Sequence, residues 1–178
     1  MRNYTVRSTY TRAESAARRA ADVIVTLFLC AALVFVLFKF IWVPEITADP
    51  GVGELENGEI VIVDRLVKYF GGYAVGDIVR ADIGGGMNEY RIIALGGSSV
   101  IIRGGSLYVD GRLLEEPYAS NIPAELDEEA EVPTGYLLLL PDDRSEITLL
   151  SRGIIPAGDV FGEVRLRIYP LNRFNLFF

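Results

Sequence analysis

Residues 21–43 read ADVIVTLFLCAALVFVLFKFIWV, an apolar run that only Asp22, Thr26 and Lys39 interrupt. A helix rises about 1.5 Å per residue, so roughly 20 apolar residues cross a hydrocarbon core of about 30 Å. Lys39 can extend to the headgroups at the far end, where Trp42 also suits the interface. A core helix would show a polar face, and a cleaved signal would be shorter and followed by small residues. We therefore predict one uncleaved transmembrane helix over residues 21–43.

The charges that flank this helix predict its orientation. Residues 1–20 carry five arginines and one glutamate, and the positive-inside rule keeps such a basic tail in the cytoplasm. Residues 44–178 then form an extracellular domain that a single pass anchors in the cytoplasmic membrane. The net charge is +4 over residues 1–43 and −11 over residues 44–178. An outer domain this acidic argues against nucleic acid as a partner.

Histidine is absent from the chain, and the single cysteine, Cys30, lies inside the apolar run. An intrachain disulfide is therefore excluded, and the ordinary zinc and haem sites lack their ligands. An oxygen-only calcium site stays open, although no segment has the spacing of an EF-hand loop. A Ser-His-Asp or Cys-His mechanism is excluded as well. We expect neither a metal nor a cofactor.

Residues 44–178 have the pattern of a mainly β domain, with short runs rich in isoleucine and valine between glycine-containing links. The run 59–66 predicts a strand buried on both faces. Asp110 and Gly111 are the preferred pair for a two-residue hairpin. The acidic stretch 115–133 predicts a solvated loop. Further strands are expected within residues 75–82, 88–95, 99–114, 134–144 and 159–171, and no amphipathic helix is expected outside the membrane.

The C-terminal NRFNLFF, residues 172–178, is unusually aromatic for a tail. Its aromatic rings could pack on the core of the β domain or lie at the membrane surface. The sequence leaves both roles open.

Six motifs follow the membrane helix in a fixed order, and together they resemble bacterial signal peptidase I from about residue 41 to residue 178. The resemblance implies a signal peptidase-like β domain of short antiparallel strands and hairpins. It also implies the activity of a membrane-anchored serine endopeptidase, which removes signal peptides from secreted preproteins. The motifs are LENGEIVIVDRL (55–66), VGDIVRAD (75–82), EYRIIALGG (89–97), SLYVDGRLLEEPYA (106–119), VPTGYLLLLPDDR (132–144) and LLSRGIIPAGDVFGEV (149–164).

The chain departs from this family at the nucleophile. The family attacks with the serine of a Ser-Met-x-Pro-Thr-Leu motif, and a lysine of lowered pKa takes the proton. Counting back from Leu55 without gaps places Pro50 at the serine position, and a shift of one residue places Asp49 there. The nearest hydroxyl is Thr47. Neither Pro50 nor Asp49 is a plausible nucleophile for this reaction.

The position of the base shows the same loss independently. Arg91 matches the arginine of the family's Lys-Arg pair, so the lysine position holds Tyr90. The only lysines in the sequence are Lys39, in or beside the membrane helix, and Lys68, away from this motif. Tyrosine has an ordinary pKa near 10 and would act as a base only if that pKa were strongly lowered.

The last motifs keep charged residues that we expect to support the fold. The family's Gly-Asp-Asn-Arg reads PDDR here, with Asp142 and Arg144, and its Asp-Ser-Arg reads LSR, with Ser151 and Arg152. Leu150 replaces the carboxylate of the second motif. We predict that such Asp/Arg pairs join two strands through bidentate contacts, with Arg91 as a further scaffold residue.

The leading hypothesis is a catalytically degenerate signal peptidase homologue that binds extended polypeptide as an added strand. The resemblance implies a secreted preprotein or a pilin as that polypeptide, with a sortase as a further partner, as in pilus assembly by Gram-positive bacteria. One alternative is an active peptidase with a displaced site, using Thr47 or Ser151 with Tyr90 as base. Another is a purely structural anchor, with Pro50 and Tyr90 filling the cleft. The expected vestigial cleft consists of Thr47, Asp49, Pro50, Tyr90 and Ser151.

Overall fold

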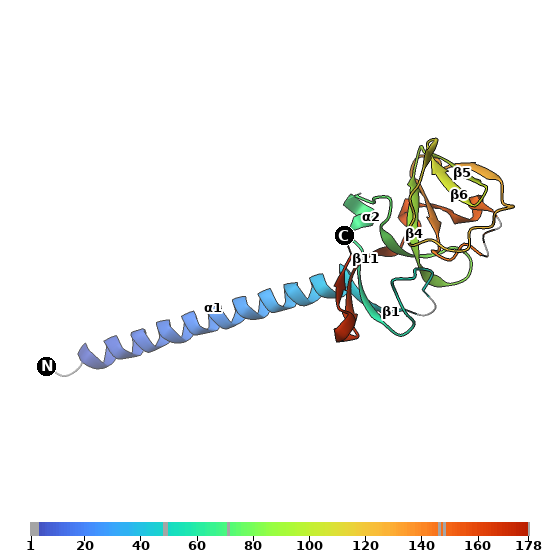
Figure 1. Ribbon diagram of the computed structural model, residues 1–178. Coiled ribbons are helices and arrows are strands. Elements are labelled where there is room, and N and C mark those ends of the chain that lie inside the picture. Colours follow the sequence, from blue (N-terminus) through green and yellow to red (C-terminus); the bar gives the residue numbers. More distant parts are fainter. Residues whose placement is uncertain (1–3, 48–49, 71, 146, 148, 178) are drawn as a thin grey trace. The chain divides into compact units, whose positions relative to one another are not determined.

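The computed structural model describes residues 4–47, 50–70, 72–145, 147 and 149–177, and these residues form two units (Figure 1). The first unit, residues 1–40, contains helix α1 (Tyr4–Phe40), whose Ala16–Leu37 segment is long and apolar enough to cross a membrane. The second unit, residues 41–178, holds every strand.

The helix differs from the predicted span at both ends. It extends back through most of the predicted tail, and it ends at Phe40, before the predicted boundary at Val43. Trp42 and Val43 belong instead to strand β1 (Trp42–Ile46), which pairs with β2. The physical reason is Pro44, because a residue that precedes proline is driven out of the helical region into extended backbone.

The larger sheet is antiparallel and follows the order β1-β2-β11-β3-β4-β9-β10, with β12 paired to β11. The sheet curls into a half-barrel, and the mainly β fold predicted from the sequence is confirmed. Its further strands are β2 (Ile60–Asp64), β3 (Ile78–Asp82), β4 (Met87–Leu95), β9 (Tyr136–Leu140), β10 (Ile154–Pro156), β11 (Gly162–Tyr169) and β12 (Asn175–Leu176).

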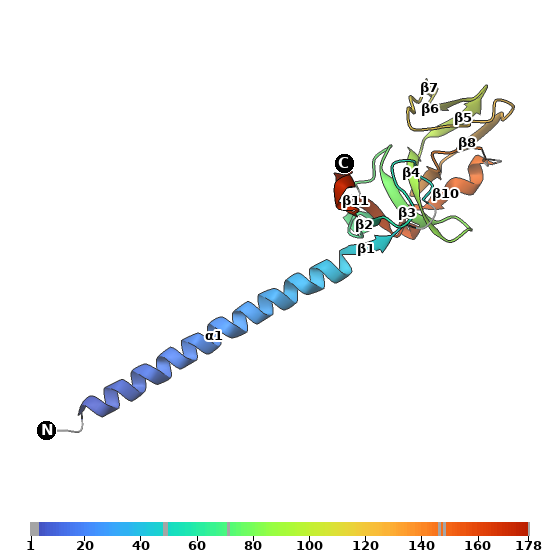
Figure 2. The ribbon, with the colours of Figure 1, turned by 60° about the horizontal axis from the view of Figure 1, so that its bottom comes forward.

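The smaller sheet follows the order β7-β6-β5-β8 and lies at one end of the β domain (Figure 2). It comprises β5 (Ser99–Arg103), β6 (Ser106–Val109), β7 (Arg112–Leu113) and β8 (Glu128–Glu131). The predicted hairpin is confirmed, because Val109 pairs with Arg112 across Asp110 and Gly111. Both turn residues have positive φ, 50° and 75°, as this two-residue turn requires.

Two sequence expectations about strands need correction. The stretch 115–133, predicted as a solvated loop, contains β8, which pairs with β5 although its residues are mostly acidic. Its Glu128 and Ala130 are only half-exposed while Glu129 and Glu131 point to solvent, so an edge strand tolerates this charge. Strand β2 is fully buried on one face and only partly buried on the other, not buried on both.

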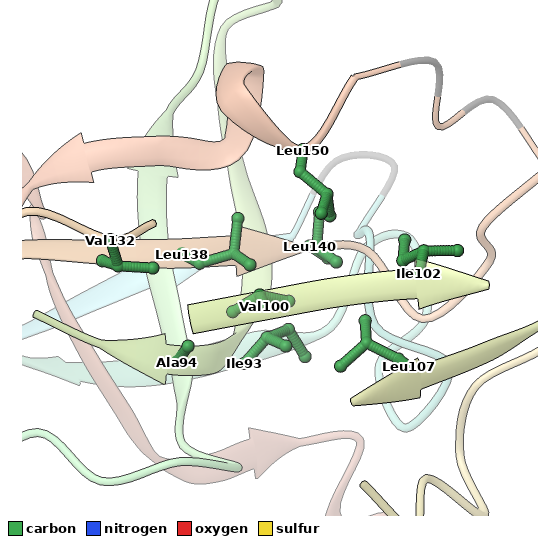
Figure 3. Packing of buried hydrophobic residues seen from close by; sticks show 9 residues of the cluster. All are labelled: Ile93, Ala94, Val100, Ile102, Leu107, Val132, Leu138, Leu140 and Leu150. Carbon is green, nitrogen blue, oxygen red and sulfur yellow. The ribbon is translucent and has the colours of Figure 1, made fainter. Parts of the chain in front are cut away.

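A cluster of aliphatic side chains joins the two sheets (Figure 3). Val100, Ile102 and Leu107 come from the smaller sheet, while Ile93 and Leu138 come from the larger one. All five are at most 2% exposed. Burial of such side chains contributes about 1.5–3 kcal/mol each, so this cluster fixes the position of β4 and β9, which the candidate site uses. Short helices complete the domain: α2 (Val67–Phe70), η1 (Leu150–Gly153), η2 (Ala157–Asp159) and η3 (Leu171–Arg173).

Candidate functional site

A polar groove of about 470 Å³ opens where four segments of the β domain meet. The segments are the loop before β2, the first half of β4, the loop after β7 and the turn after β9. The structure brings Pro50 and Tyr90 together in this groove, although they are far apart in the sequence. Its lining consists of Pro50, Gly51, Gly53, Asn88, Tyr90, Tyr118, Ser120, Pro141, Asp142, Asp143 and Ser145.

One wall of the groove is the loop that carries Pro50, and glycine lets this loop lie directly on β4. A Cβ atom at Gly51 would lie 2.6 Å from the carbonyl oxygen of Glu89, so a larger residue would push the loop away. Two hydrogen bonds fix the same loop to Asp142. The Asp142 amide donates to the Gly51 carbonyl at 2.6 Å, and the Gly53 amide donates to Asp142 Oδ2 at 3.0 Å.

Asp142, which lines the groove, forms a buried ion pair with Arg91. Arg91 Nε donates to Asp142 Oδ1 at 3.0 Å, and Arg91 Nη2 donates to Oδ2, also at 3.0 Å. Arg91 further donates to Glu54 Oε1 and to the carbonyl of Gly76, each at 3.0 Å. Its guanidinium lies 3.9 Å from the centre of the Tyr118 ring. Asp142 therefore makes a bidentate contact, but with Arg91 rather than with an arginine of its own or the following motif, and this contact holds β4 to the turn after β9.

The other predicted scaffold residues have different partners or surroundings. Arg144 is buried and pairs with Glu116, at 2.6 Å between Nη2 and Oε1, rather than with Asp142. Arg152 is exposed on η1 and forms no ion pair with any residue that the structure describes. The pairing follows packing, because Arg144 points into the interior beside Glu116 whereas Arg152 points outward.

Of the predicted cleft residues that the structure describes, Pro50 and Tyr90 line the groove and Thr47 and Ser151 do not. Thr47 is fully buried, where its hydroxyl donates to the Glu56 carbonyl and accepts from the Glu59 amide at 3.1 Å. It therefore fastens the loop and does not line the groove. Ser151 is exposed on η1, also outside the groove, and Asp49 lies outside the described residues.

Sequence reasoning missed Tyr118, Ser120 and Ser145 as groove residues. Tyr118 belongs to the EEPY motif and Ser145 directly follows PDDR, so both motifs marked the right segments. Ser120 carried no signal of its own. The sequence could not show that these segments meet, because 27 residues separate Tyr118 from Ser145.

The hydroxyl groups of Ser145 and Tyr118 hydrogen-bond to the carboxylates of Asp143 and Glu116, but neither pair has the proton affinities that proton abstraction at neutral pH requires. Asp142 is held by Arg91, and the pKa of Asp143 is lowered by the Ser145 amide and by the Asn121 side chain. Burial, together with the charge of Glu116, raises the pKa of Tyr118 to about 12. A carboxylate of lowered pKa is a weak base, and a tyrosine of raised pKa stays protonated at neutral pH.

Glu163 of β11 lines a second, smaller cavity of about 180 Å³ beside Arg91 and Glu54. Burial raises its pKa from the ordinary 4.5 to about 7; Asp77 and Asp64 add to the shift, and Arg165 opposes it. The Arg165 Nη1 atom lies 2.8 Å from Glu163 Oε1. Since the folded-state pKa is the higher one, folding takes up a proton between about pH 4.5 and pH 7.

We expect Glu163→Gln to flatten the pH dependence of stability. The parent should lose stability as pH rises through this window, by at most about 1.4 kcal/mol per pH unit, because the ionised carboxylate is buried. Glutamine is neutral throughout, so the variant should match the parent near pH 5 and exceed it at pH 8. Denaturation across this pH range checks this, with the exposed Glu129→Gln as control. If the stability of Glu163→Gln changed with pH as the parent's does, the raised pKa of Glu163 would be contradicted.

Comparison with known proteins gives several matches to this chain. A family model described as "Signal peptidase, peptidase S26" matches residues 18–169. Signal peptidase I U of Bacillus subtilis (strain 168) is 29% identical over 165 residues, 84% of this chain and 88% of the relative. Inactive signal peptidase IA of Staphylococcus aureus (strain Mu50) is 26% identical over 171 residues, 90% of this chain and 98% of the relative. The span matched by the family model includes every residue that lines the groove.

One solved structure can be set beside these relatives. The crystal structure of a signal peptidase I from Enterococcus faecalis V583 aligns with a TM-score of 0.44 and 24% identity. The alignment covers 52% of this chain and 97% of that chain.

Proposed function

The chain belongs to the signal peptidase family, peptidase S26, and from this premise we propose that it is a non-catalytic member that binds extended polypeptide in its groove. The observation that carries the proposal is the groove itself. Pro50 and Tyr90, which we assign to the positions of the nucleophile and the base, line it together with Asp142, and Asp142 is held by Arg91. A relative named Inactive signal peptidase IA supports a degenerate member.

Strand β4 lines the groove through Asn88 and Tyr90. Strand β3 pairs with β4 from Met87 to Arg91, whereas the ladder with β9 begins only at Arg91. The groove therefore follows the half of β4 that β9 does not reach. Recognition of an extended segment through main-chain hydrogen bonds and side-chain pockets needs no nucleophile.

The proposal places the β domain at the outer face of the cytoplasmic membrane. Helix α1 can act as the anchor, and the arginines before its apolar segment favour a cytoplasmic N-terminus. A secreted preprotein would reach the groove on that side. A pilin, with a sortase as assembly partner, is a narrower version of the same proposal.

A substitution that fills the groove tests polypeptide binding. We expect Ser120→Trp to weaken binding of a peptide carrying an Ala-x-Ala signal site at least about tenfold, or about 1.4 kcal/mol. Ser120 is exposed and lines the groove, so the indole would occupy the space of the peptide. The matched control is Ser151→Trp, on an exposed serine outside the groove, which should leave affinity unchanged. Fluorescence anisotropy with the full-length protein in detergent gives both dissociation constants.

The outcomes separate the competing functions. Equal weakening by both variants would mean that the peptide binds elsewhere. No binding by the folded parent would favour the structural anchor, in which the buried Tyr90 side chain closes the cleft. A parallel incubation with a preprotein, beside an active signal peptidase, should give no cleavage, and cleavage by this protein would overturn the non-catalytic proposal.

A further inference from the structure

The last described residues of the chain fold back onto the loop that forms the groove wall. Residues 171–177, here called the C-terminal hook, comprise η3, β12 and Phe177. Strand β12 pairs with β11 through Leu176 and Leu166, and the Phe177 amide donates to the Arg165 carbonyl at 2.9 Å. Residues 175–177 of the hook are therefore attached to β11 of the larger sheet.

Phe177 is the apolar contact between the hook and the loop. Its side chain is 8% exposed and belongs to the same buried cluster as Val52 and Leu55. Val52 stands between Gly51 and Gly53, the two glycines that line the groove. The sequence left open whether the aromatic tail packs on the core or lies at the membrane surface. Phe177 packs in the core, whereas Phe174 is 57% exposed.

Two arginines supply the polar contacts to the same loop. Arg167 Nη1 donates to the Glu54 carbonyl at 2.6 Å, and Arg167 Nε donates to the carbonyl of Arg173 in the hook at 2.5 Å. Arg173 Nη2 donates to the Glu54 carbonyl at 3.4 Å, and Arg173 also pairs with Glu56 and with the buried Glu59. The carbonyl of Glu54 thus receives two guanidinium donors.

Glu54 links this network, through Arg91, to the groove residue Asp142. Its carboxylate accepts from Arg91, the arginine that holds Asp142. Leu176, Phe177 and Arg91 line one cavity, whereas no residue of the hook lines the groove. An effect of the hook on a bound polypeptide is therefore indirect, through residues 50–55 or through Arg91 and Asp142.

We propose that Phe177 and Arg173 are positioning residues that hold residues 50–59 in place and so set the shape of the groove. The expected effect on affinity rests on the proposed polypeptide binding. The expected effect on the order of residues 50–59 does not depend on that proposal. Loss of either contact leaves the groove residues chemically unchanged but releases the wall that carries Pro50, Gly51 and Gly53.

Hydrogen exchange and peptide affinity together test this inference in the full-length protein. We expect Phe177→Ala to speed exchange of the Leu55 and Gly58 amides, which donate within the loop to Val52 and Thr47. Exchange in β5 and β6 should stay at the parental rate. Affinity for the Ala-x-Ala peptide should fall about tenfold, since ordering the wall would then cost binding energy. Phe177→Leu, which keeps an apolar side chain, should show exchange rates and a peptide affinity close to those of the parent.

The matched control is Leu171→Ala, in the same hook but 81% exposed, which should change neither measurement. Arg173→Gln provides a second variant that removes the polar contacts while leaving the buried cluster intact, should Phe177→Ala fail to fold. Unchanged exchange at Leu55 and Gly58 in Arg173→Gln would overturn the proposal. If the variants exchanged faster but the parent bound no peptide, the positioning role would stand and polypeptide binding would be refuted.

Discussion

Arg91→Met should lower the free energy of unfolding by about 3–5 kcal/mol, because it leaves the carboxylate of Asp142 buried without its partner. Asp142 is 3% exposed and receives both hydrogen bonds of the bidentate pair from Arg91. The same change removes the donors to Glu54 and Gly76, so two further contacts around the groove are lost. Chemical denaturation in detergent, followed by the fluorescence of Trp42, measures the loss.

The control for this prediction is a solvent-exposed ion pair. Arg103 and Asp127 lie 3.2 Å apart, with side chains 67% and 65% exposed. Arg103→Met should cost no more than about 1 kcal/mol, since water screens such a pair. If Arg91→Met cost as little, Asp142 would have another source of stabilisation, and the Arg91–Asp142 pair would not be the support of the groove.

Gly153→Ala should lower the free energy of unfolding by about 3 kcal/mol or more, at the upper end of overpacking effects. A Cβ atom at Gly153 would overlap the carbonyl oxygen of Leu139 and would lie 3.1 Å from Leu138 Cδ1. Strand β9 cannot move aside easily, because it is hydrogen-bonded to β4 and to β10. The clash is with backbone, so a change of rotamer does not relieve it.

Gly158→Ala is the matched control for Gly153→Ala, since nothing lies within 4 Å of a Cβ atom built at Gly158. Its effect should stay within about 0.5 kcal/mol, as for surface substitutions in general. Thermal or chemical denaturation of both variants gives the comparison. Equal stability of the two would mean that η1 shifts away from β9 at little cost.

The family, the N-terminal apolar helix and the β domain could all be predicted from the sequence. Each rests on residues that are neighbours in the chain. The apolar segment of α1 is one continuous run, and the Asp110-Gly111 turn needs only two residues of the right type. The absence of serine at residue 50 and of lysine at residue 90 is likewise visible in the sequence once the motifs align.

Which side chains line the groove depends on contacts between residues that are distant in the chain, and the sequence indicates such contacts poorly. Thr47 was the nearest hydroxyl to the predicted nucleophile by residue count, yet its side chain turns into the interior to satisfy the Glu59 amide. Ser151 follows a buried leucine but points to solvent from η1. Distance along the chain says nothing about which way a loop side chain points.

From the sequence alone follow the signal peptidase family and a mainly β domain behind an apolar helix, together with the prediction that the usual nucleophile and base are lost. Only the tertiary structure decided that Asp142 pairs with Arg91 rather than Arg144, and that Phe177 packs behind the groove wall. The reason is the distance along the chain over which each effect acts. Apolar runs and turn residues act on neighbouring residues in the chain, whereas ion-pair partners and buried contacts depend on which distant strands the fold brings together.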